Sequence, residues 1–296
     1  MSSGPVTVVT GANSGIGRAT AIHLAAAGHR VVGTVRSLAK AEKLRAMSDA
    51  AGVSVDLVEV DVADDDSVRS GFDEIQAMTG RVDHLVNNAG IGGNAVVEEC
   101  TPQMFLDVMN VNLNGAIRCA QAVLPQMRER GAGTIVNVTS VVGKLAALAQ
   151  APYVASKWAL EGASEELAQE VAPFGIRVAI VEPGVTKSAI FAKNIDAPNA
   201  TGAYDVHYGR MFQFYAAGIA QATDPFEVAE VVRHAIETDQ PKLRYAVSWG
   251  GPEIVAGRER LSDEDWVALG ALADDSQYYR RFQEIFGVDI APVTGG

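Results

Sequence analysis

Cysteine is nearly absent from this 296-residue chain, which contains only Cys100 and Cys119. Their separation matches neither a zinc-binding motif nor a redox pair, and it gives no sign of a disulfide framework. We therefore expect no metal site and no disulfide framework. This usage is typical of a protein from a reducing, cytoplasmic compartment.

Basic residues are also scarce, with 24 Lys and Arg against 36 Asp and Glu and a net charge of −12. Such an acidic balance disfavours nucleic acid and anionic membranes as partners. No apolar run approaches the roughly 18 residues of a membrane span. The chain enters a predicted strand at residues 6–10 without a basic and apolar leader. We therefore expect a small-molecule partner rather than nucleic acid or a membrane.

What the chain does contain is a regular alternation of short β-branched runs and helical segments. The runs that predict strands lie at residues 6–10, 30–35, 53–60, 84–86, 133–139, 177–181 and 243–247. Hairpin signals are few, which favours one parallel sheet over antiparallel pairs. We predict the α/β class: a doubly wound parallel sheet between two helical layers, in a single three-layer α/β/α domain over residues 1–250.

Two segments stand outside this alternation. Residues 186–223 mix aromatic side chains with Gly, Pro and Asn, and a long insertion after a strand is typical of an active-site lid. An ordinary helical hairpin over the edge of the core is the alternative. Residues 251–296 predict a helical C-terminal extension, which we expect to pack on the domain or on a neighbouring subunit through aromatic residues such as Trp266 and Phe282.

The first predicted strand leads directly into a glycine-rich turn and then into a helix that ends near Gly28. This arrangement presents the backbone N–H groups of a helix N-terminus to a pyrophosphate. The spacing here is G-x-x-x-G-x-G rather than G-x-G-x-x-G, and glycines alone can simply make a tight turn. With the strand and the helix in place, we interpret the segment as a dinucleotide site. Its residues are Gly11, Asn13, Ser14, Gly15, Ile16 and Gly17.

The residues after the second predicted strand indicate which dinucleotide binds. NAD-binding proteins of this type usually carry an acidic residue there, about 20 residues past the glycines, which holds the ribose 2′-hydroxyl. Here the first acidic residue after the turn is Glu42, whereas Arg36 directly follows the strand and Arg18, Arg30 and Lys40 are nearby in sequence. A guanidinium can bind a 2′-phosphate with two hydrogen bonds. We therefore predict NADP(H), with NAD(H) as the alternative and a solvated Arg36 as the ordinary explanation.

Tyr153 and Lys157 are four residues apart in a predicted helix, so their side chains share one face. A free tyrosine has a pKa of about 10, and a cation within roughly 4–6 Å stabilises the phenolate and lowers that pKa. Ser140 ends a predicted strand, at the edge where open parallel sheets bind ligands. The spacing alone would also suit an amphipathic tyrosine beside a solvated lysine. We interpret Tyr153 as a general acid/base whose pKa Lys157 lowers.

For two further polar residues the sequence leaves two roles open. Asp61 follows the third predicted strand, where it could bind adenine or simply cap a turn. Asn112 lies inside a long predicted helix from residue 101 to about 131, which we expect to bend around 110–115 and at Pro125. Asparagine fits helix interiors poorly. Its side chain therefore either faces solvent or works inward from a kink.

Taken together, these motifs resemble the short-chain dehydrogenase/reductase family over residues 5 to about 187. The matching segments are residues 10–17, Asp61 and Val62, residues 87–90, Asn112 and Gly115, Ser140, Tyr153 and Lys157, and Pro183 and Gly184. The resemblance implies a Rossmann-like fold and hydride transfer between NAD(P) and a carbonyl or an alcohol.

The resemblance also implies roles for individual residues. Tyr153 would supply the proton, Ser140 would hydrogen-bond the same substrate oxygen, and Lys157 would lower the tyrosine pKa and bind the nicotinamide ribose. Asn112 would hold a water that relays protons to Lys157. Beyond the glycine turn, the cofactor contacts would come from Arg36, Asp61, Val62, Asn88, Ala89, Gly90, Tyr153, Lys157, Pro183, Gly184, Val185 and Thr186.

Family members commonly assemble through two long helices, which lie here at about 102–130 and 153–172. The resemblance therefore implies a homo-oligomer, a dimer or a tetramer.

The substrate is indicated only coarsely. Phe191, Phe212, Phe214 and Leu145 are expected near the mouth of the site, and the second half of the chain is similar to retinol- and hydroxysteroid-type reductases. We therefore expect a bulky apolar ketone, aldehyde or hydroxysteroid-like alcohol. The alternatives are an NAD-linked alcohol dehydrogenase, a non-catalytic dinucleotide-sensing protein, and a dehydratase or epimerase.

Overall fold

A computed structural model describes residues 4–188 and 197–292 of the chain. Within these residues, seven strands form one sheet in the order β3-β2-β1-β4-β5-β6-β7, and every neighbouring pair is parallel. The strands are β1 (Val6–Val9), β2 (Arg30–Val35), β3 (Val55–Glu59), β4 (His84–Asn87), β5 (Gly133–Val138), β6 (Ile176–Pro183) and β7 (Arg244–Val247). The order reverses between β1 and β4, which confirms the predicted doubly wound sheet.

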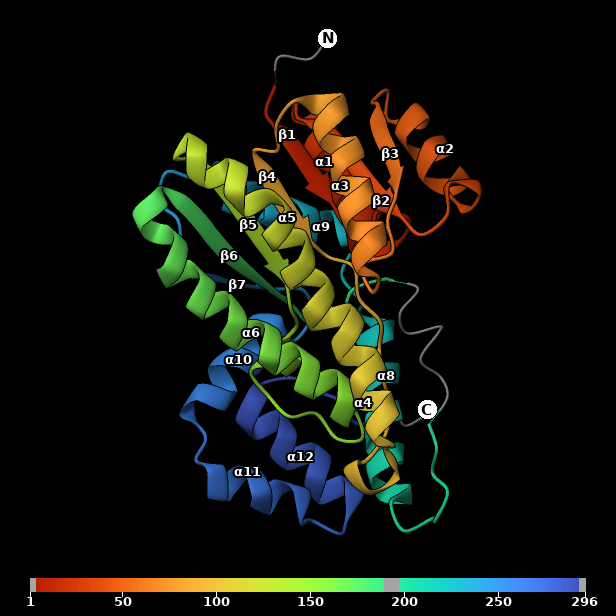
Figure 1. Cartoon of the computed structure of the whole chain (residues 1–296). Coiled ribbons are helices and arrows are strands. Elements are labelled where there is room, and N and C mark those ends of the chain that lie inside the picture. Colours follow the sequence, from red (N-terminus) through yellow and green to blue (C-terminus); the bar gives the residue numbers. More distant parts are fainter. Residues whose placement is uncertain (1–3, 189–196, 293–296) are drawn as a thin grey trace.

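Helices cover both faces of the sheet (Figure 1). One face carries α1 (Gly15–Ala26), α2 (Glu42–Ala50) and α9 (Pro225–Glu237). The other carries α3 (Asp65–Thr79), α5 (Gly115–Arg130) and α6 (Ala151–Val171), and α4 (Pro102–Met109) packs beside α6. The three-layer α/β/α arrangement is therefore confirmed.

The strands are buried on both faces, which explains their continuous β-branched sequence. Val8, Leu85 and Ile135 face α3 and α5, whereas Val9 and Val86 face α1 and α9. All five side chains are fully buried, and each contributes about 1.5–3 kcal/mol of hydrophobic stabilisation. Two separate apolar layers thus hold the sheet in place.

The predicted long helix is irregular around residues 110–115, where a π-helical turn interrupts it, and the α-helix continues through Pro125. Helix α4 ends at Met109, a π-helix (η3) follows at Asn110–Asn114, and α5 then begins. Thr101 caps α4 by accepting a hydrogen bond from the Met104 N–H. Asn112 lies in the π-turn and is buried. The inward-facing alternative for Asn112 is therefore confirmed.

The segment with the loosened pattern contains a regular helix, α8 (Asp205–Ala220). Tyr208, Met211 and Tyr215 lie three and four residues apart in it and are buried together, which gives one apolar helical face. Of the four side chains expected near the mouth, Phe191 lies outside the described residues. The sequence offered helical structure here only as the alternative, an ordinary helical hairpin, because glycines and scattered polar residues obscure the helical period.

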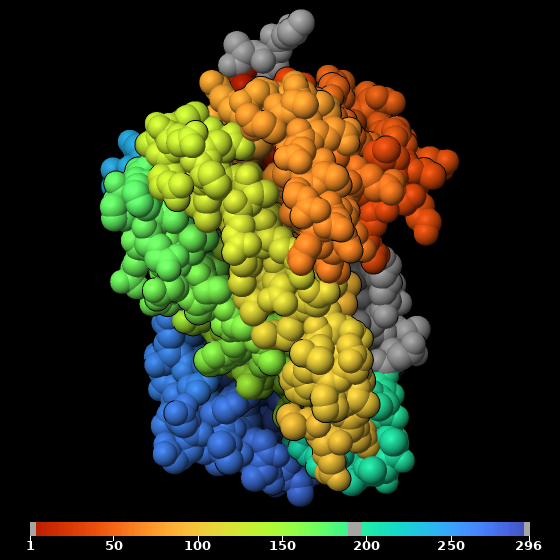
Figure 2. Space-filling view, viewed as in Figure 1, coloured from red at the N-terminus to blue at the C-terminus, as the bar shows by residue number. Residues whose placement is uncertain are grey.

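The C-terminal residues form α10 (Gly251–Arg260), α11 (Asp263–Gly270) and α12 (Asp275–Phe286). Figures 1 and 2 show these blue elements below α6, at the end of the sheet where the strands finish. Phe282 and Phe286 pack with Phe214 of α8 and with Trp249 in one apolar cluster. Arg210 of α8 is buried, bonds Asp275 at 2.8 Å and lies 4.1 Å from the centroid of the Tyr278 ring. The extension thereby holds α8 against the domain.

Short 3-10 turns complete the described elements: η1 (Leu38–Lys40), η2 (Val97–Glu99), η4 (Val141–Gly143) and η5 (Ala172–Phe174). No helix in residues 4–188 and 197–292 has the length and apolar content to cross a bilayer.

Candidate active site

The carboxyl ends of the strands open into a cavity of about 930 Å³. It lies at the point where the strand order reverses, which is where doubly wound sheets bind ligands. All predicted site residues except Gly17 and Asn112 line this cavity. The sequence therefore located the cavity, and the structure refines the position of the two exceptions.

The glycine turn leaves its backbone open to a closely approaching ligand. Its backbone conformation also disfavours residues other than glycine. Gly11 and Gly15 have φ angles of +65° and +52°, in the left-handed region. A Cβ at Gly11 would lie 2.9 Å from the Cα of Ala89. Gly17 serves packing instead, since a Cβ there would lie 2.3 Å from Nδ2 of Asn88. Its place is thus behind the turn rather than on the cavity.

The donor set of the turn fits a dinucleotide pyrophosphate. Helix α1 begins at Gly15, and Ser14 precedes it in an extended conformation, so the first N–H groups of α1 have no partner within the helix. The Asn13 Oδ1 atom is buried and has no hydrogen-bond partner within the described residues, while its Nδ2 donates to the Lys40 carbonyl at 3.0 Å. The unpaired N–H groups and the absence of a Cβ at the glycines suit a phosphate ligand. The Asn13 Oδ1 is an acceptor, so it suits a hydroxyl or N–H donor of a ligand rather than its phosphates.

Only two of the four basic residues near the second strand reach the cavity. Arg36 and Lys40 line it. Arg30 begins β2 and therefore lies at the opposite end of the sheet, where it pairs with Asp56 at 3.3 Å. Arg18 donates to the Met47 Sδ atom and does not line the cavity. Proximity in sequence therefore does not bring all four to the site: strand direction takes Arg30 to the far end of β2, and Arg18 lies on α1 against Met47.

Asp61 both caps a turn and lies on the cavity. Its Oδ1 accepts a hydrogen bond from the Ala63 N–H at 3.0 Å, and its side chain is among the lining groups. Asn88 is fixed to the neighbouring strand, since its Nδ2 donates to the Thr10 carbonyl at 2.9 Å. The Thr10 hydroxyl in turn accepts from the N–H groups of Asn88 and Ala89 at 3.0 Å each. Hydrogen bonds between side chains and backbone groups thus fix this part of the cavity wall.

Ser140, Tyr153 and Lys157 converge at the other end of the cavity. Ser140 lies directly after β5 and caps η4, with its Oγ accepting from the Val142 N–H at 3.3 Å. It is also a side-chain hydrogen-bond partner of Tyr153. On the same face of α6, the Lys157 Nζ lies 5.7 Å from the centroid of the Tyr153 ring and donates to the Val138 carbonyl at 3.0 Å. The predicted shared face is therefore confirmed.

The electrostatics of this triad differ from the expectation. Burial raises the pKa of Tyr153 to about 12, and the hydrogen bond with Ser140 partly opposes this shift. Burial lowers the pKa of Lys157 to about 8, opposed by the carboxylate of Glu161. The predicted lowering of the tyrosine pKa by Lys157 is wrong in this state. The reason is that desolvation dominates and the ammonium is directed at a backbone carbonyl.

Asn112 lies beside the triad rather than on the cavity. Its Oδ1 accepts from the Ile91 N–H at 2.8 Å, and its Nδ2 donates to the Ile91 carbonyl and the Ser156 Oγ at 2.9 Å each. A Cβ at Gly90 would lie 3.2 Å from that Oδ1 and 3.8 Å from the Lys157 Nζ. Both amide hydrogens are used, so only an acceptor lone pair remains for a water.

Several lining residues were not predicted. Tyr215 of α8 donates to the Asn94 Oδ1 at 2.9 Å, and Gln150 and Val142 join it on the cavity wall. The aromatic content of residues 186–223 was the signal for Tyr215, but Gln150 and Val142 carried none. Of the three expected mouth residues in the described part of the chain, Phe214 alone lines the cavity. Phe212 is exposed, and Leu145 is buried against the C-terminal helices.

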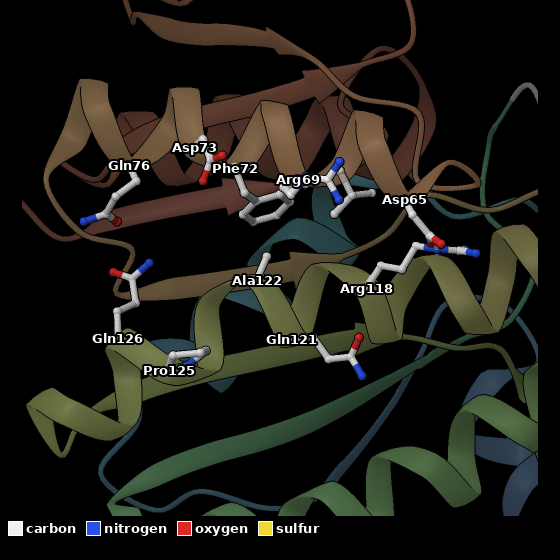
Figure 3. A pocket seen from close by; sticks show the side chains of 11 residues that line it. Asp65, Arg69, Phe72, Asp73, Gln76, Arg118, Gln121, Ala122, Pro125 and Gln126 are labelled. Carbon is white, nitrogen blue, oxygen red and sulfur yellow. Dashed lines mark hydrogen bonds and ion pairs between the residues drawn. The ribbon is translucent and has the colours of Figure 1, made fainter.

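A second hollow, of about 440 Å³, lies between α3 and α5 on the outer surface (Figure 3). Its wall combines Phe72 and Val68 with the ion pair between Arg118 and Asp65. It contains no nucleophile and no buried titratable group, so we assign it no chemistry. The described residues also contain no group of three or more His, Cys, Asp or Glu side chains that could hold a metal.

Comparison with known proteins agrees with this geometry. The chain is 36% identical to a short-chain dehydrogenase from Streptomyces avermitilis, with a TM-score of 0.79 over 94% of this chain and 98% of that one. It is 32% identical to the actinorhodin polyketide ketoreductase with NADPH, with a TM-score of 0.70 over 80% of this chain and 91% of that one. It is also 35% identical to the human 17-beta-hydroxysteroid dehydrogenase type 1, covering 81% of this chain and 76% of that one.

The sequence also matches one protein family over a range that covers most of the sheet. Residues 5–199 match the short chain dehydrogenase family, and this range includes the glycine turn, Ser140, Tyr153 and Lys157. The chain therefore belongs to the short-chain dehydrogenase/reductase family of oxidoreductases, which act on CH–OH and carbonyl groups.

Proposed function

We propose that this oxidoreductase transfers hydride between NADP(H) and a bulky apolar ketone or aldehyde, or the corresponding secondary alcohol. The observation that carries the proposal is the convergence of Ser140, Tyr153 and Lys157 in the cavity that also holds the glycine turn. NADPH in the actinorhodin ketoreductase structure supports the choice of cofactor.

The chain's own residues would divide the dinucleotide between them. The glycine turn and the first N–H groups of α1 would bind the pyrophosphate, and Asn88, Ala89 and Gly90 would contact the adenosine. Arg36 has no ion-pair partner within the described residues and lines the cavity with Lys40, so both are available for a 2′-phosphate. The backbone of Val185 and Thr186 would contact the carboxamide of the nicotinamide.

In carbonyl reduction, the bound cofactor supplies the hydride. Tyr153 would donate its proton to the substrate oxygen, and the Ser140 hydroxyl would hydrogen-bond the same oxygen. With a pKa of about 12 the phenol is protonated at neutral pH, as an acid must be before the transfer. A positioned acid contributes about 10²–10⁴ in rate, and a donor to the developing oxyanion contributes about 10²–10³. Lys157 would stabilise the phenolate that remains and bind the nicotinamide ribose.

The substrate end of the cavity favours an apolar, uncharged molecule. Phe214, Tyr215, Val141 and Val142 line it, and the basic lining groups Arg36 and Lys40 lie at the adenosine end, beside the glycine turn. The human hydroxysteroid dehydrogenase among the relatives supports a substrate of this kind.

The deciding experiment measures oxidation of NADPH and of NADH by the purified protein with a panel of aliphatic, aromatic and steroid ketones. We expect turnover with NADPH and apolar ketones, and a KM for NADH at least tenfold higher. A preference for NADH would favour the NAD-linked alcohol dehydrogenase instead. Tight NADPH binding without turnover of any ketone or alcohol would favour the non-catalytic sensing protein.

We also infer a homo-oligomer that forms through α4, α5 and α6. Leu106, Ile117 and Trp158 expose apolar side chains on these helices, with Leu106 61% exposed and Trp158 47% exposed. Such exposure is typical of association surfaces. Sedimentation of the wild type and of a Leu106→Glu, Trp158→Glu variant tests this.

A cytoplasmic setting is proposed as well, supported by Cys100 and Cys119 being unpaired thiols.

A further inference from the structure

A second group of charged side chains lies beneath Lys157, outside the cavity. Glu161 follows Lys157 by four residues on α6 and therefore points in the same direction. It is 4% exposed. Neither the neighbouring sequence nor the proposed reaction explains a buried carboxylate at this position. Burying a charge costs free energy unless the charge is paired and hydrogen-bonded.

Two hydrogen bonds fix the Glu161 carboxylate. Thr139 Oγ1 donates to its Oε1 at 2.6 Å, and Arg244 Nε of β7 donates to its Oε2 at 3.0 Å. Gly143 leaves the space that the side chain occupies, since a Cβ there would lie 2.9 Å from the Glu161 Cγ. The carboxylate thus lies between the segment that carries Ser140 and the helix that carries Lys157. Both partners, a guanidinium and a hydroxyl, are hydrogen-bond donors to the carboxylate.

The surrounding charges do not cancel the Glu161 charge. Arg244 is shared, because it also pairs with exposed Glu165 at 2.7 Å and lies 3.7 Å from the Glu182 Oε1 of β6. Burial, and after it the Glu161 charge, raise the pKa of Glu182 to about 7. Lys144 and Glu259 also act on Glu182 from neighbouring segments. Glu161 therefore exerts a negative potential on its buried surroundings.

Lys157 lacks any other counter-charge in the part of the chain that is described. Its neighbours are the Tyr153 ring, the Asn112 amide across Gly90, and the Val138 carbonyl. Burial lowers its pKa, and Glu161 is the charged group that opposes this shift. The Lys157 ammonium and the Glu161 carboxylate are thus carried one helical turn apart, and the same packing separates both from solvent.

We propose that Glu161 is a positioning residue of this enzyme: its fixed carboxylate keeps Lys157 in the ammonium form that the proposed reaction uses. The part that this role plays in catalysis rests on the proposed function, whereas the effect of the Glu161 charge on Lys157 does not. Removing one negative charge lowers the proton affinity of the Tyr153–Lys157 pair as a whole, whichever of the two loses its proton first.

The test titrates Lys157 directly by NMR in the full chain with ¹³C-labelled lysine, with and without NADPH. The Lys157→Arg variant identifies the signal. The wild type is expected to titrate at about pH 8, and Glu161→Gln about one pH unit lower. Glu165→Gln is the matched control, since Glu165 also lies on α6 and pairs with Arg244 but is exposed. It should titrate as the wild type does.

Enzyme kinetics supply the second measurement. The high-pH limb of kcat/KM for NADPH-dependent ketone reduction should move to lower pH in Glu161→Gln and return toward the wild-type position in Glu161→Asp. A merely structural role would lower kcat without moving this limb.

An unchanged Lys157 midpoint in folded Glu161→Gln overturns the inference. If that variant does not fold, Glu161→Met, of similar length and without charge, replaces it and must show the same fall. If the midpoint falls but the wild type reduces no ketone, the proposed function fails and the role of Glu161 stands.

Discussion

The two ends of the cavity are built in different ways. At the end proposed for the cofactor, short segments next to β1, β2 and β4 lie together: hydrogen bonds between side-chain and backbone groups join Thr10 to Asn88, and Gly11 lies against Ala89. At the end proposed for the substrate, Phe214 packs against residues beyond 249, and Tyr215 packs with Val96 and Ala149. The difference teaches that a site formed by segments next to strands has local sequence signals, whereas a site built by packing draws on distant segments.

The largest contrast between the ends should come from Tyr153→Phe. This change removes the proton donor and leaves the glycine turn intact, so we expect turnover to fall by about 10²–10⁴ with NADPH affinity within a few-fold of the wild type. Stopped-flow turnover and fluorescence titration measure the two. Tyr279→Phe, on α12, is the control and should keep full turnover. Near-normal turnover in Tyr153→Phe would contradict the assigned role.

Ser140→Ala should give the next largest effect, a loss of about 10²–10³ in kcat. In the proposed reaction the Ser140 hydroxyl would hydrogen-bond the developing oxyanion. Its removal also leaves the Val142 N–H at the start of η4 without its cap. Circular dichroism melting checks that the fold survives. A change confined to KM would mean that Ser140 binds substrate without stabilising the transition state.

Arg36→Ala tests the cofactor end alone. Losing a cation that faces a 2′-phosphate should raise the KM for NADPH about tenfold, by about 1.4 kcal/mol, and leave the KM for NADH nearly unchanged. Arg30→Ala is the matched control, because Arg30 lies at the far end of β2 and pairs with Asp56. Equal effects on both cofactors would exclude 2′-phosphate recognition by Arg36.

The smallest expected effect concerns stability near the substrate end. The pKa of Glu182 is raised from 4.5 to about 7 by burial. Between these values the folded state holds a proton that the unfolded state lacks, so stability falls as pH rises. Relative to Glu182→Gln, the wild type should lose on the order of 1 kcal/mol between pH 5 and 8. Urea unfolding at each pH measures this, and exposed Glu74→Gln should show no such trend.

Much of the fold and of the cofactor end could be predicted because their signals are local. A β-branched run followed by glycines fixes a strand and a turn, and Tyr153 and Lys157 share a face through helix geometry alone. The failures are non-local. Arg30 is close to Arg36 in sequence but lies at the other end of β2, and sequence proximity does not reveal strand direction. Tyr215 and Gln150 were missed because only the folded chain brings α8 and the start of α6 to one wall.

The pKa expectation failed for a related reason. Sequence spacing predicts that Lys157 lies near Tyr153, but it does not predict how deeply both are buried or that Val138 accepts the ammonium hydrogen bond. Likewise, nothing in the local sequence joins Glu161 to Arg244, which are 83 residues apart. Charge effects depend on burial and on partners from other strands, so they become visible only in three dimensions.

The π-turn at Asn110–Asn114 has a consequence for altered chain length. Such a turn uses one residue more than an α-turn and advances every later side chain by about 100° around the axis. That phase sets the Cα of Gly115 against Val62, where a Cβ would lie 2.8 Å from the Val62 Cγ2. Deleting a single residue there would make the helix regular. The packing face of α5 would then turn away from the sheet, and Asn112 would lose its contacts with Ile91. The π-turn therefore determines which side of α5 faces the sheet.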